Sequence, residues 1–423
     1  MTQRPQSRRT RANPGRVAAA RSLVSIENGD FADECMIKFA PKEGADRRLV
    51  WHLVLGVLRR QGEIDGAIAP LIKGPITKLD PEVRAALRIA GFERLFAGTK
   101  KHALVDQAVE VIKALGKRRA TGFVNAIARR IQPSSELSRE TMTNHPHWLV
   151  ERWTARYGEE STDAWCARNN EPPPLYLVLK EEDSKWPKLW TENGIQVHPV
   201  RFDDQEISRI FRISNTQGNV DSLPGFAEGG FWVQDLASVL SADCIPASVG
   251  LSVLDACAAP GGKSFRLLSC GHQVTAVDCS QGRLKRMSTS LRRLHFESET
   301  IQHDWLQGPL GNGSRKWGAV LVDAPCTGLG TVRRHPEIRW RRTPLDLGVL
   351  SKMQASVLEN AACHVEASGI LVYSVCSPEP EEGRNIVAEF LEKHSEFRLD
   401  LERETAPPEQ DEDAFYMARM VRE

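Results

Sequence analysis

The second half of the chain is dominated by short apolar runs that alternate with stretches of helical periodicity. The runs at residues 253–254, 274–277, 319–322 and 370–372 each lead into a polar or chemically reactive residue. Strands that alternate with helices in this way predict parallel pairing through crossover connections. We therefore expect a doubly wound α/β sheet whose ligand sites lie at the carboxyl ends of the strands.

The first third of the chain has the period of helices instead. Over residues 17–131 apolar side chains recur three and four positions apart, which predicts a bundle of amphipathic helices. Asp80 followed by Pro81 predicts the start of one helix, because aspartate caps helices and proline suits the first turn. Residues 136–230 combine helical spacing with a candidate strand at residues 175–179, which indicates a smaller α+β region.

These changes of pattern divide the chain into four expected parts. They are a basic disordered arm (1–16), an all-α helical domain (17–135), a small α+β middle domain (136–230) and a C-terminal α/β domain (231–423). The 423 residues are enough for separate hydrophobic cores in two or three domains. A single small binding module is excluded.

The net charge of +1 hides a basic N-terminal arm. Its arginines all precede Glu27, the first acid, and are Arg4, Arg8, Arg9, Arg11, Arg16 and Arg21. Such an arm suits a polyanion and equally a solubilising tail. No run approaches about 18 apolar residues and no signal-peptide core is present, so we expect a cytoplasmic protein without a membrane partner. The alternative for an arginine-rich start that lacks acids is an organelle transit peptide.

Nine cysteines are scattered along the chain, with no C-x-x-C pair. This arrangement argues against a disulfide framework and against a zinc site, so no metal is expected. Most of them are expected to be small buried apolar residues. Cys326 and Cys376, however, follow two of the apolar runs, and adjacent strands would bring both thiols to one rim of the sheet.

A loop of small residues follows the first apolar run and reads Asp255-Ala-Cys-Ala-Ala-Pro-Gly-Gly-Lys263. It would let the backbone approach a ligand at the start of a helix. A Walker A loop would need glycine at position 257, and no G-x-G-x-x-G is present here, so both phosphate cradles are excluded. Asp278 ends the next run, where an acid can bind ribose hydroxyls or merely cap a helix, and Asp304 suits an adenine contact. An adenosine ligand without a phosphate cradle indicates S-adenosylmethionine.

Two cysteines beside such a loop suit the methylation of an electron-poor carbon. Carbon 5 of cytosine does not attack a methyl sulfonium directly, but a thiolate that adds to C6 makes an enamine whose C5 can attack. A base must then remove the C5 proton so that the thiol can leave. Asp323 could steady that base or the donor, and Lys263 is either part of the site or an ordinary surface cation. Asp323 is followed by Ala-Pro-Cys, not by the Pro-Pro-aromatic sequence expected for methylation of an amine.

A cationic stretch follows Cys326 and consists of Arg333, Arg334, His335, Arg339, Trp340, Arg341 and Arg342. Arginine pairs with phosphates, and either arginine or tryptophan can stack on an unpaired base. The alternative is a solvated helix face. Because the stretch lies directly beside Cys326 in the sequence, we favour an RNA contact.

These motifs resemble those of the RsmB/Fmu/Sun group of ribosomal small-subunit RNA cytosine-5 methyltransferases, within the Nop/Sun superfamily. The resemblance rests on Ala256-Cys-Ala-Ala-Pro-Gly-Gly-Lys263, on Asp323-Ala-Pro-Cys326 with Arg333-Arg-His-Pro-Glu337, and on Tyr373-Ser-Val-Cys-Ser377. The helical region is similar to the NusB-type RNA-binding domain of this group, notably at Leu87-Arg-Ile-Ala-Gly-Phe-Glu-Arg-Leu-Phe96. Val375 stands where the group usually has threonine.

The resemblance implies an enzyme of three parts: a NusB-like RNA-binding domain, a middle RNA-binding subdomain and a Rossmann-like methyltransferase domain. It implies that Cys376 is the nucleophile and that Cys326 assists its release, with Asp323 and Lys263 in the same machinery. The residues that it implies for donor binding are Cys257, Ala258, Ala259, Pro260, Gly261, Gly262, Lys263, Asp278, Asp304 and Asp323.

The resemblance further implies a monomer that acts on 16S ribosomal RNA and leaves S-adenosylhomocysteine as product. Two other functions remain open at this point. One is an RNA-binding ribosome-assembly factor whose catalytic domain has lost its activity, and the other is a transfer-RNA cytosine-5 methyltransferase. The presence of both thiols, Lys263 and the three acids favours an active enzyme, and the NusB-like region favours ribosomal RNA by analogy.

Overall fold

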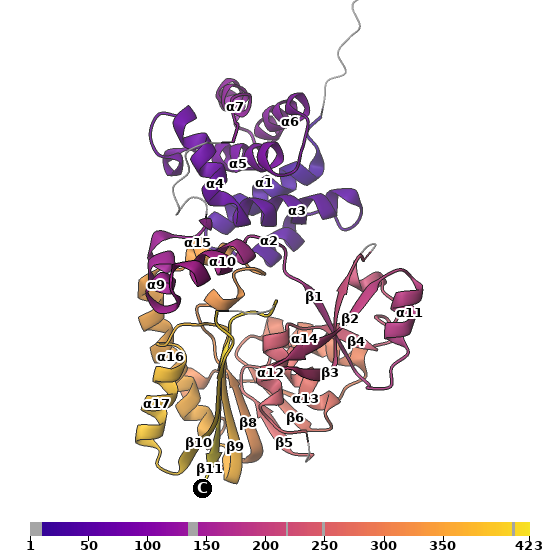
Figure 1. Ribbon diagram of the computed structural model, residues 1–423, viewed down its shortest axis with the longest axis vertical. Coiled ribbons are helices and arrows are strands. Elements are labelled where there is room, and N and C mark those ends of the chain that lie inside the picture. The colour runs from indigo at the N-terminus through magenta and orange to yellow at the C-terminus, as the bar shows by residue number, and fades with distance from the viewer. Residues whose placement is uncertain (1–10, 134–142, 217–218, 248–249, 408–410) are drawn as a thin grey trace, which may run out of the picture. The chain divides into compact units, whose positions relative to one another are not determined.

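The computed structural model describes residues 11–133, 143–216, 219–247, 250–407 and 411–423 (Figure 1). The chain forms two compact units. The helical unit comprises the described residues up to Pro172 together with Val332–Arg342, and the sheet unit comprises those of Pro173–Thr331 and Thr343–Glu423. The chain therefore enters the helical unit twice.

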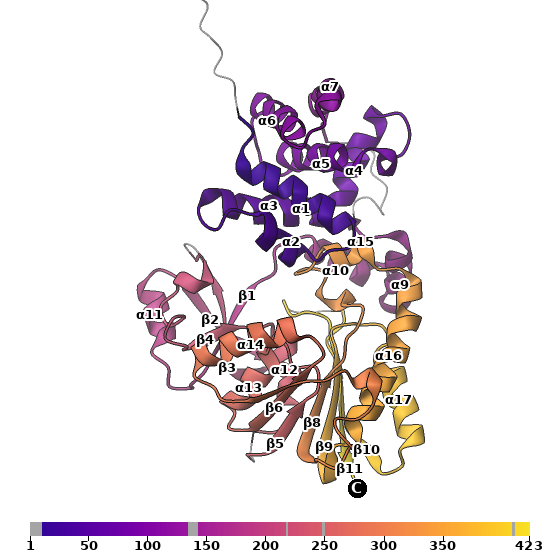
Figure 2. The same ribbon diagram turned by 180° about the vertical axis from the view of Figure 1, so that it is seen from behind.

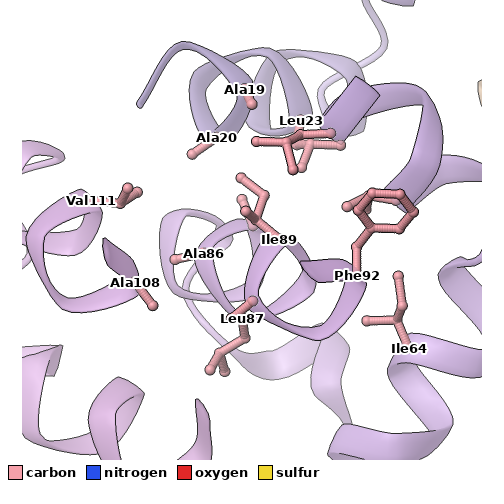
Figure 3. Close-up of a cluster of buried hydrophobic side chains, with 14 of the residues drawn as sticks. Ala19, Ala20, Leu23, Ile64, Ala86, Leu87, Ile89, Phe92, Ala108 and Val111 are labelled. Atoms are coloured by element: carbon pink, nitrogen blue, oxygen red, sulfur yellow. The ribbon is translucent and has the colours of Figure 1, made fainter. Parts of the chain in front are cut away.

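The helical unit is a bundle of amphipathic helices, which confirms the prediction from the spacing of apolar residues. α5 (Pro81–Leu95) packs against five other helices of the bundle. Its Ile89 and Phe92 lie in an apolar core with Leu23 (Figure 3). Besides α5, the helices of this unit are α1 (Pro14–Glu27), α2 (Ala32–Phe39), α3 (Ala45–Arg59), α4 (Gln61–Ile68), α6 (Lys101–Ala114), α7 (Thr121–Ala128), α9 (His147–Tyr157), α10 (Glu159–Asn169) and α15 (Glu337–Arg341), with 3₁₀ turns η1 (Ala69–Leu71), η2 (Ile76–Lys78) and η3 (Arg118–Ala120).

The start of α5 follows the expected pattern, since the Asp80 side chain accepts a hydrogen bond from the backbone N–H of Glu82 at 3.2 Å. The start of α1 differs from the expected extent of the basic arm. Arg16 lies inside α1 and forms a 2.5 Å ion pair with the buried Glu93. Residues 1–10 of the arm lie outside the described residues.

The segment Val332–Arg342 carries α15 into the helical unit. Arg339 of this segment is fully buried. Its guanidinium donates only to oxygens of neutral groups among the hydrogen bonds of the described residues. These oxygens are the carbonyls of Asn144 (3.3 Å), Asn169 (2.8 Å) and Val332 (3.0 Å) and the side-chain oxygen of Asn170 (2.7 Å).

The prediction that this stretch contacts RNA is therefore wrong for Arg339. Its guanidinium is buried among four protein oxygens, where a phosphate cannot reach it. Trp340 is half-buried, packs against the helical core and donates its indole N–H to the carbonyl of Leu58 at 2.8 Å. Arg341 is exposed and lies over the ring of Phe31, 4.4 Å from its centroid. Helical charge spacing alone could not separate a buried arginine from an exposed one.

Replacing Arg339 with alanine is expected to destabilise the helical unit by roughly 2–4 kcal/mol, because it leaves a cavity and removes the donor from four buried oxygens. The exposed Arg341→Ala variant should cost less than about 1 kcal/mol. Hydrogen–deuterium exchange in urea would localise the loss to α9 and α10. Equal protection of these helices in both variants would contradict the structural role of Arg339.

The sheet unit begins with a small antiparallel sheet of order β2-β3-β1-β4. Its strands are β1 (Leu175–Leu179), β2 (Gln196–Phe202), β3 (Gln205–Ser214) and β4 (Phe231–Val233). α11 (Trp186–Glu192) contributes the fully buried Trp190 to the core beside this sheet. The expected strand at residues 175–179 is confirmed. This small α+β region precedes the larger sheet in the chain.

The larger sheet has seven strands in the order β10-β11-β9-β8-β5-β6-β7. β5 (Ser252–Asp255), β6 (Gln273–Asp278), β7 (Glu299–Gln302), β8 (Trp317–Asp323) and β9 (Val365–Val375) pair in parallel. This confirms the doubly wound α/β prediction. β10 (Phe397–Glu404) and β11 (Tyr416–Arg422) add an antiparallel edge. The 3₁₀ turns of the unit are η4 (Val220–Ser222), η5 (Trp305–Gln307) and η6 (Leu329–Thr331).

Helices cover both faces of the seven-stranded sheet (Figures 1 and 2). Along β8, Ala319 and Leu321 pack in one apolar layer, and Val320 and Val322 pack in the other. This alternation explains why the run is apolar at every position, since both faces of the strand are buried. The first layer includes α12 (Leu236–Asp243), α13 (Gly262–Ser269) and α14 (Gln281–Leu294), and the second includes α16 (Pro344–Ala362) and α17 (Arg384–Lys393).

No helix among the described residues combines the length and the apolar composition that crossing a bilayer demands.

Candidate active site

A pocket of about 450 Å³ lies at the carboxyl ends of the parallel strands. Residues that follow five strands in turn reach it: Cys257 after β5, Asp278 at the end of β6, Asp304 after β7, Asp323 at the end of β8 and Cys376 after β9. The volume is in the range of small-molecule sites in proteins. The doubly wound topology thus brings together residues that are 119 positions apart, from 257 to 376.

The loop between β5 and α13 forms one wall of the pocket. Cys257 and Ala259 line it, while Ala258, Pro260 and Gly261 of the same loop and Gly262 at the start of α13 do not. Gly261 has a φ of +118°, and a Cβ there would lie 2.3 Å from the ring of Phe265. Glycine is therefore required both by the backbone conformation and by the space beside it.

Asp278 is held rigidly at the edge of the pocket. One of its oxygens accepts a hydrogen bond from the backbone N–H of Ser280 at 2.7 Å and pairs with Arg283 at 2.8 Å. The other accepts from the backbone N–H of Ala259 at 3.3 Å, which links the carboxylate to the loop after β5. Only 2% of Asp278 is exposed. Its carboxylate both caps the segment that follows β6 and lines the pocket.

Asp304 begins the 3₁₀ turn η5, where its side chain accepts a hydrogen bond from the N–H of Leu306 at 3.0 Å. Trp305 follows and donates its indole N–H to the carbonyl of Ala256 at 2.6 Å. Trp305 and Leu306 also line the pocket, and Met353 and Val357 of α16 add further apolar surface. The pocket therefore combines acidic side chains with an apolar wall.

Lys263 is not a surface cation, because only 8% of it is exposed. Its ammonium group forms a 2.7 Å ion pair with Asp323. Burial lowers the pKa of Lys263, but the charge and hydrogen bond of Asp323 outweigh that effect and the pKa is raised overall, with Cys376 adding to the rise. The amine is therefore charged and is paired with Asp323.

A chain of hydroxyls supports Asp323 from the side opposite Lys263. Ser374 donates to Asp323 at 3.3 Å, and Ser241 of α12 donates to Ser374 at 2.7 Å. Both serines are fully buried. These contacts fix the carboxylate between α13, which carries Lys263, and the end of β9.

The two cysteines that the sequence assigned to one rim do meet there. Their sulfur atoms are 3.3 Å apart, neither cysteine is in a disulfide, and both line the pocket. The hydrogen bond with Cys376 and burial raise the pKa of Cys326 well above its usual value. Cys326 is thus held as a thiol beside Cys376.

Cys257 is a third sulfur in the pocket. Burial and the nearby carboxylates raise its pKa well above its usual value, so it stays protonated and unreactive. Among the described residues there is no group of three or more histidine, cysteine or acidic side chains that could hold a metal ion.

Several residues around the pocket were not expected from the sequence. Trp305, Leu306, Arg283 and Met353 line it. The fully buried Glu382 accepts hydrogen bonds from Thr327 and Ser377, the residues that follow the two cysteines. Trp305 could have been predicted, because it directly follows the candidate Asp304. The others lie on helices and connecting loops, where no local pattern marks a residue as pocket-lining.

Three family models match the chain. Residues 248–421 match the 16S rRNA methyltransferase RsmB/F model, residues 13–133 match the NusB family, and residues 145–207 match the ferredoxin-like domain of RsmF/B-like methyltransferases. The three matches follow one another along the chain in the order that the sequence motifs predict.

Curated relatives span nearly the whole chain. The ribosomal RNA small subunit methyltransferase B of Pseudomonas putida is 31% identical and covers 97% of this chain and 98% of its own, and that of Serratia proteamaculans is 30% identical and covers 89% and 91%. The solved structure of PH0851 is 24% identical, covers 97% and 99% and has a TM-score of 0.82. NSun6 from Pyrococcus horikoshii, solved with SFG, is 18% identical, covers 66% and 98% and has a TM-score of 0.56. At these identities the two structures support the fold.

Proposed function

Because the chain belongs to the RsmB/F family of 16S rRNA methyltransferases, we propose that it transfers a methyl group from S-adenosylmethionine to carbon 5 of a cytosine in small-subunit ribosomal RNA. The observation that carries this proposal is the pair of thiols of Cys326 and Cys376, 3.3 Å apart at the wall of a pocket with acidic and apolar sides. Methylation of an exocyclic amine has no need of two thiols.

The residues of the pocket fit the donor. The Asp278 and Asp304 carboxylates follow neighbouring strands, where acids accept hydrogen bonds from ribose hydroxyls or from adenine. Leu306, Met353 and Val357 supply apolar surface for a flat base. The donor, when bound, supplies an electrophilic methyl group on a sulfonium.

Cys376 acts as the nucleophile in this proposal. Its thiolate adds to C6 of the cytosine, which forms an S–C6 bond and moves electron density to C5. Cys376 contributes to the raised pKa of the buried Lys263, which keeps a fixed positive charge beside the pocket. Asp323 keeps Lys263 in this position through the 2.7 Å ion pair.

Cys326 acts after C5 has been methylated. It takes the C5 proton, the electron pair of the C–H bond restores the C5–C6 double bond, and the S–C6 bond breaks. To accept that proton Cys326 passes its own to the departing sulfur of Cys376, 3.3 Å away. Both residues end as thiols. Cys376 then loses its proton to water, which restores the thiolate and releases one proton for each methyl group transferred.

Bisulfite sequencing of ribosomal RNA tests the proposal in cells. Deletion of the gene is expected to remove the mark at one cytosine of the small-subunit RNA, and the wild-type chain should restore it while Cys376→Ala should not. An unchanged methylation map would favour an RNA-binding assembly factor. Loss of a methylated cytosine from transfer RNA instead would show that the substrate is transfer RNA.

A further inference from the structure

One buried carboxylate lies between the two loops that carry the cysteines. Glu382 follows β9, before α17, and is fully buried. One of its oxygens accepts the backbone N–H of Thr327 at 2.8 Å, and the other accepts the hydroxyls of Thr327 and Ser377 at 2.5 Å each. The residue after Cys326 and the residue after Cys376 are therefore bonded to the same side chain.

Other contacts fix Glu382 itself. Gln354 of α16 donates from Nε2 both to Glu382 and to the carbonyl of Pro325, at 3.0 Å in each case. The Tyr373 hydroxyl donates to the backbone carbonyl of Glu382 at 2.6 Å. The loop of Cys326 is thus held on both sides of the cysteine, and the anchor is tied to a helix and to a strand.

The donors to this carboxylate are neutral groups. Burial raises the pKa of Glu382, while the hydrogen bonds from Ser377, Thr327 and Gln354 lower it and only partly offset the burial. A buried carboxyl group is costly for a fold, and an apolar side chain could fill the same space. What an apolar side chain could not do is bond to both cysteine loops at once.

We propose that Glu382 is a positioning residue that sets the separation of the two thiols by anchoring the Cys326 and Cys376 loops to one point. The role of this separation in turnover rests on the proposed function, because nucleophile and proton acceptor must reach the same base. Glu382 acts through Thr327 and Ser377 and does not line the pocket.

The first test measures thiol geometry without any methyl transfer. Dibromobimane alkylates two neighbouring thiols and fluoresces when it bridges them, and a Cys326→Ser variant defines the background from the other cysteines. Glu382→Ala is expected to slow the bridging of Cys326 to Cys376 about tenfold or more, since the loops lose their common anchor. Glu389→Ala, which removes an exposed glutamate of α17, should bridge like the wild type.

Glu382→Gln distinguishes positioning from charge. Its amide oxygen can accept from Thr327 N–H and Gln354, and its NH₂ can donate to the hydroxyls of Thr327 and Ser377, which rotate to accept. This variant should therefore keep most of the bridging rate. Where Glu382→Ala does not fold, the double variant Thr327→Val with Ser377→Ala removes the two hydroxyl contacts and should also slow bridging.

The second test separates kcat from binding. Glu382→Ala is expected to lower kcat about 100-fold, while KM for the RNA and the Kd for S-adenosylmethionine stay within about threefold, because misplacement by an ångström costs rate more than affinity. Equal bridging rates in Glu382→Ala and wild type would overturn the positioning role. Failure of the proposed function would leave a different trace: slowed bridging with no cytosine methylation by the wild type.

Discussion

Replacing Cys376 with alanine is expected to lower the rate of cytosine methylation by a factor on the order of 10⁴ or more, because the proposed reaction has no other way to activate C5. Without the S–C6 bond, C5 stays too electron-poor to attack the methyl group. The measurement is a single-turnover transfer of radiolabelled methyl to a 16S RNA fragment. The donor pocket should be intact, so the Kd for S-adenosylmethionine should change little.

Cys363→Ala is a matched control for that experiment. Cys363 is a half-buried free thiol at the end of α16, and it does not line the pocket. Its variant should keep methylation within about threefold of the wild type, as expected for a substitution away from the site. Methylation by Cys376→Ala at more than a few per cent of the wild-type rate would end the proposed mechanism.

Replacing Cys326 with alanine is expected to trap the enzyme on its substrate. Cys376 should still add to C6 and C5 should still be methylated, but the C5 proton has lost its nearby acceptor and the S–C6 bond persists. Turnover should fall about 10³-fold, in the range of lost general acid–base catalysis. A protein–RNA adduct that carries the radiolabelled methyl group should accumulate, and a denaturing gel would detect it.

The double variant Cys326→Ala with Cys376→Ala provides the control, because it lacks the sulfur that forms the adduct. No adduct should appear with this chain. A Cys326→Ala chain that turns over normally would show that another group removes the C5 proton. An adduct in the double variant would show that some other nucleophile attacks the base.

Much of the fold could be predicted because burial leaves a regular trace in a sequence. The strands β5, β6, β8 and β9 are buried on both faces and read as continuous apolar runs, which identifies them directly. β10 could not be predicted from the sequence, because most of its side chains are charged and few of them are buried. An edge strand gains its place from pairing with β11, which lies twelve residues further along the chain.

The residues of the candidate site also fall into those that could be predicted from the sequence and those that could not. The positions of Asp278, Asp323 and Cys376 could be anticipated because each ends or directly follows a parallel strand. Glu382 could not, since it binds the two cysteine loops through tertiary contacts that no local motif records. Arg339 was misjudged for a related reason. Its neighbours in space come from α10 and from the loop before α9, far away in the sequence.

Val375 stands where the family usually has threonine, and its place in the fold explains why valine is tolerated there. It is fully buried in the apolar layer that includes α16, and it does not line the pocket. Successive residues of a strand point to opposite faces. A threonine at this position would therefore direct its hydroxyl into that layer, away from the sulfur of the next residue.

The double passage of the chain through the helical unit limits how the protein can be dissected. A fragment that stops at Pro172 would lack Val332–Arg342, so the pocket filled by Arg339 would be empty and three asparagines would face one another without their common donor. Such a fragment is a damaged version of the native unit. Excision of the short return segment, even with flexible linkers to rejoin the chain, would remove Arg339 from the helical unit in the same way. Domain swaps between relatives must therefore exchange two stretches of gene to move one piece of protein.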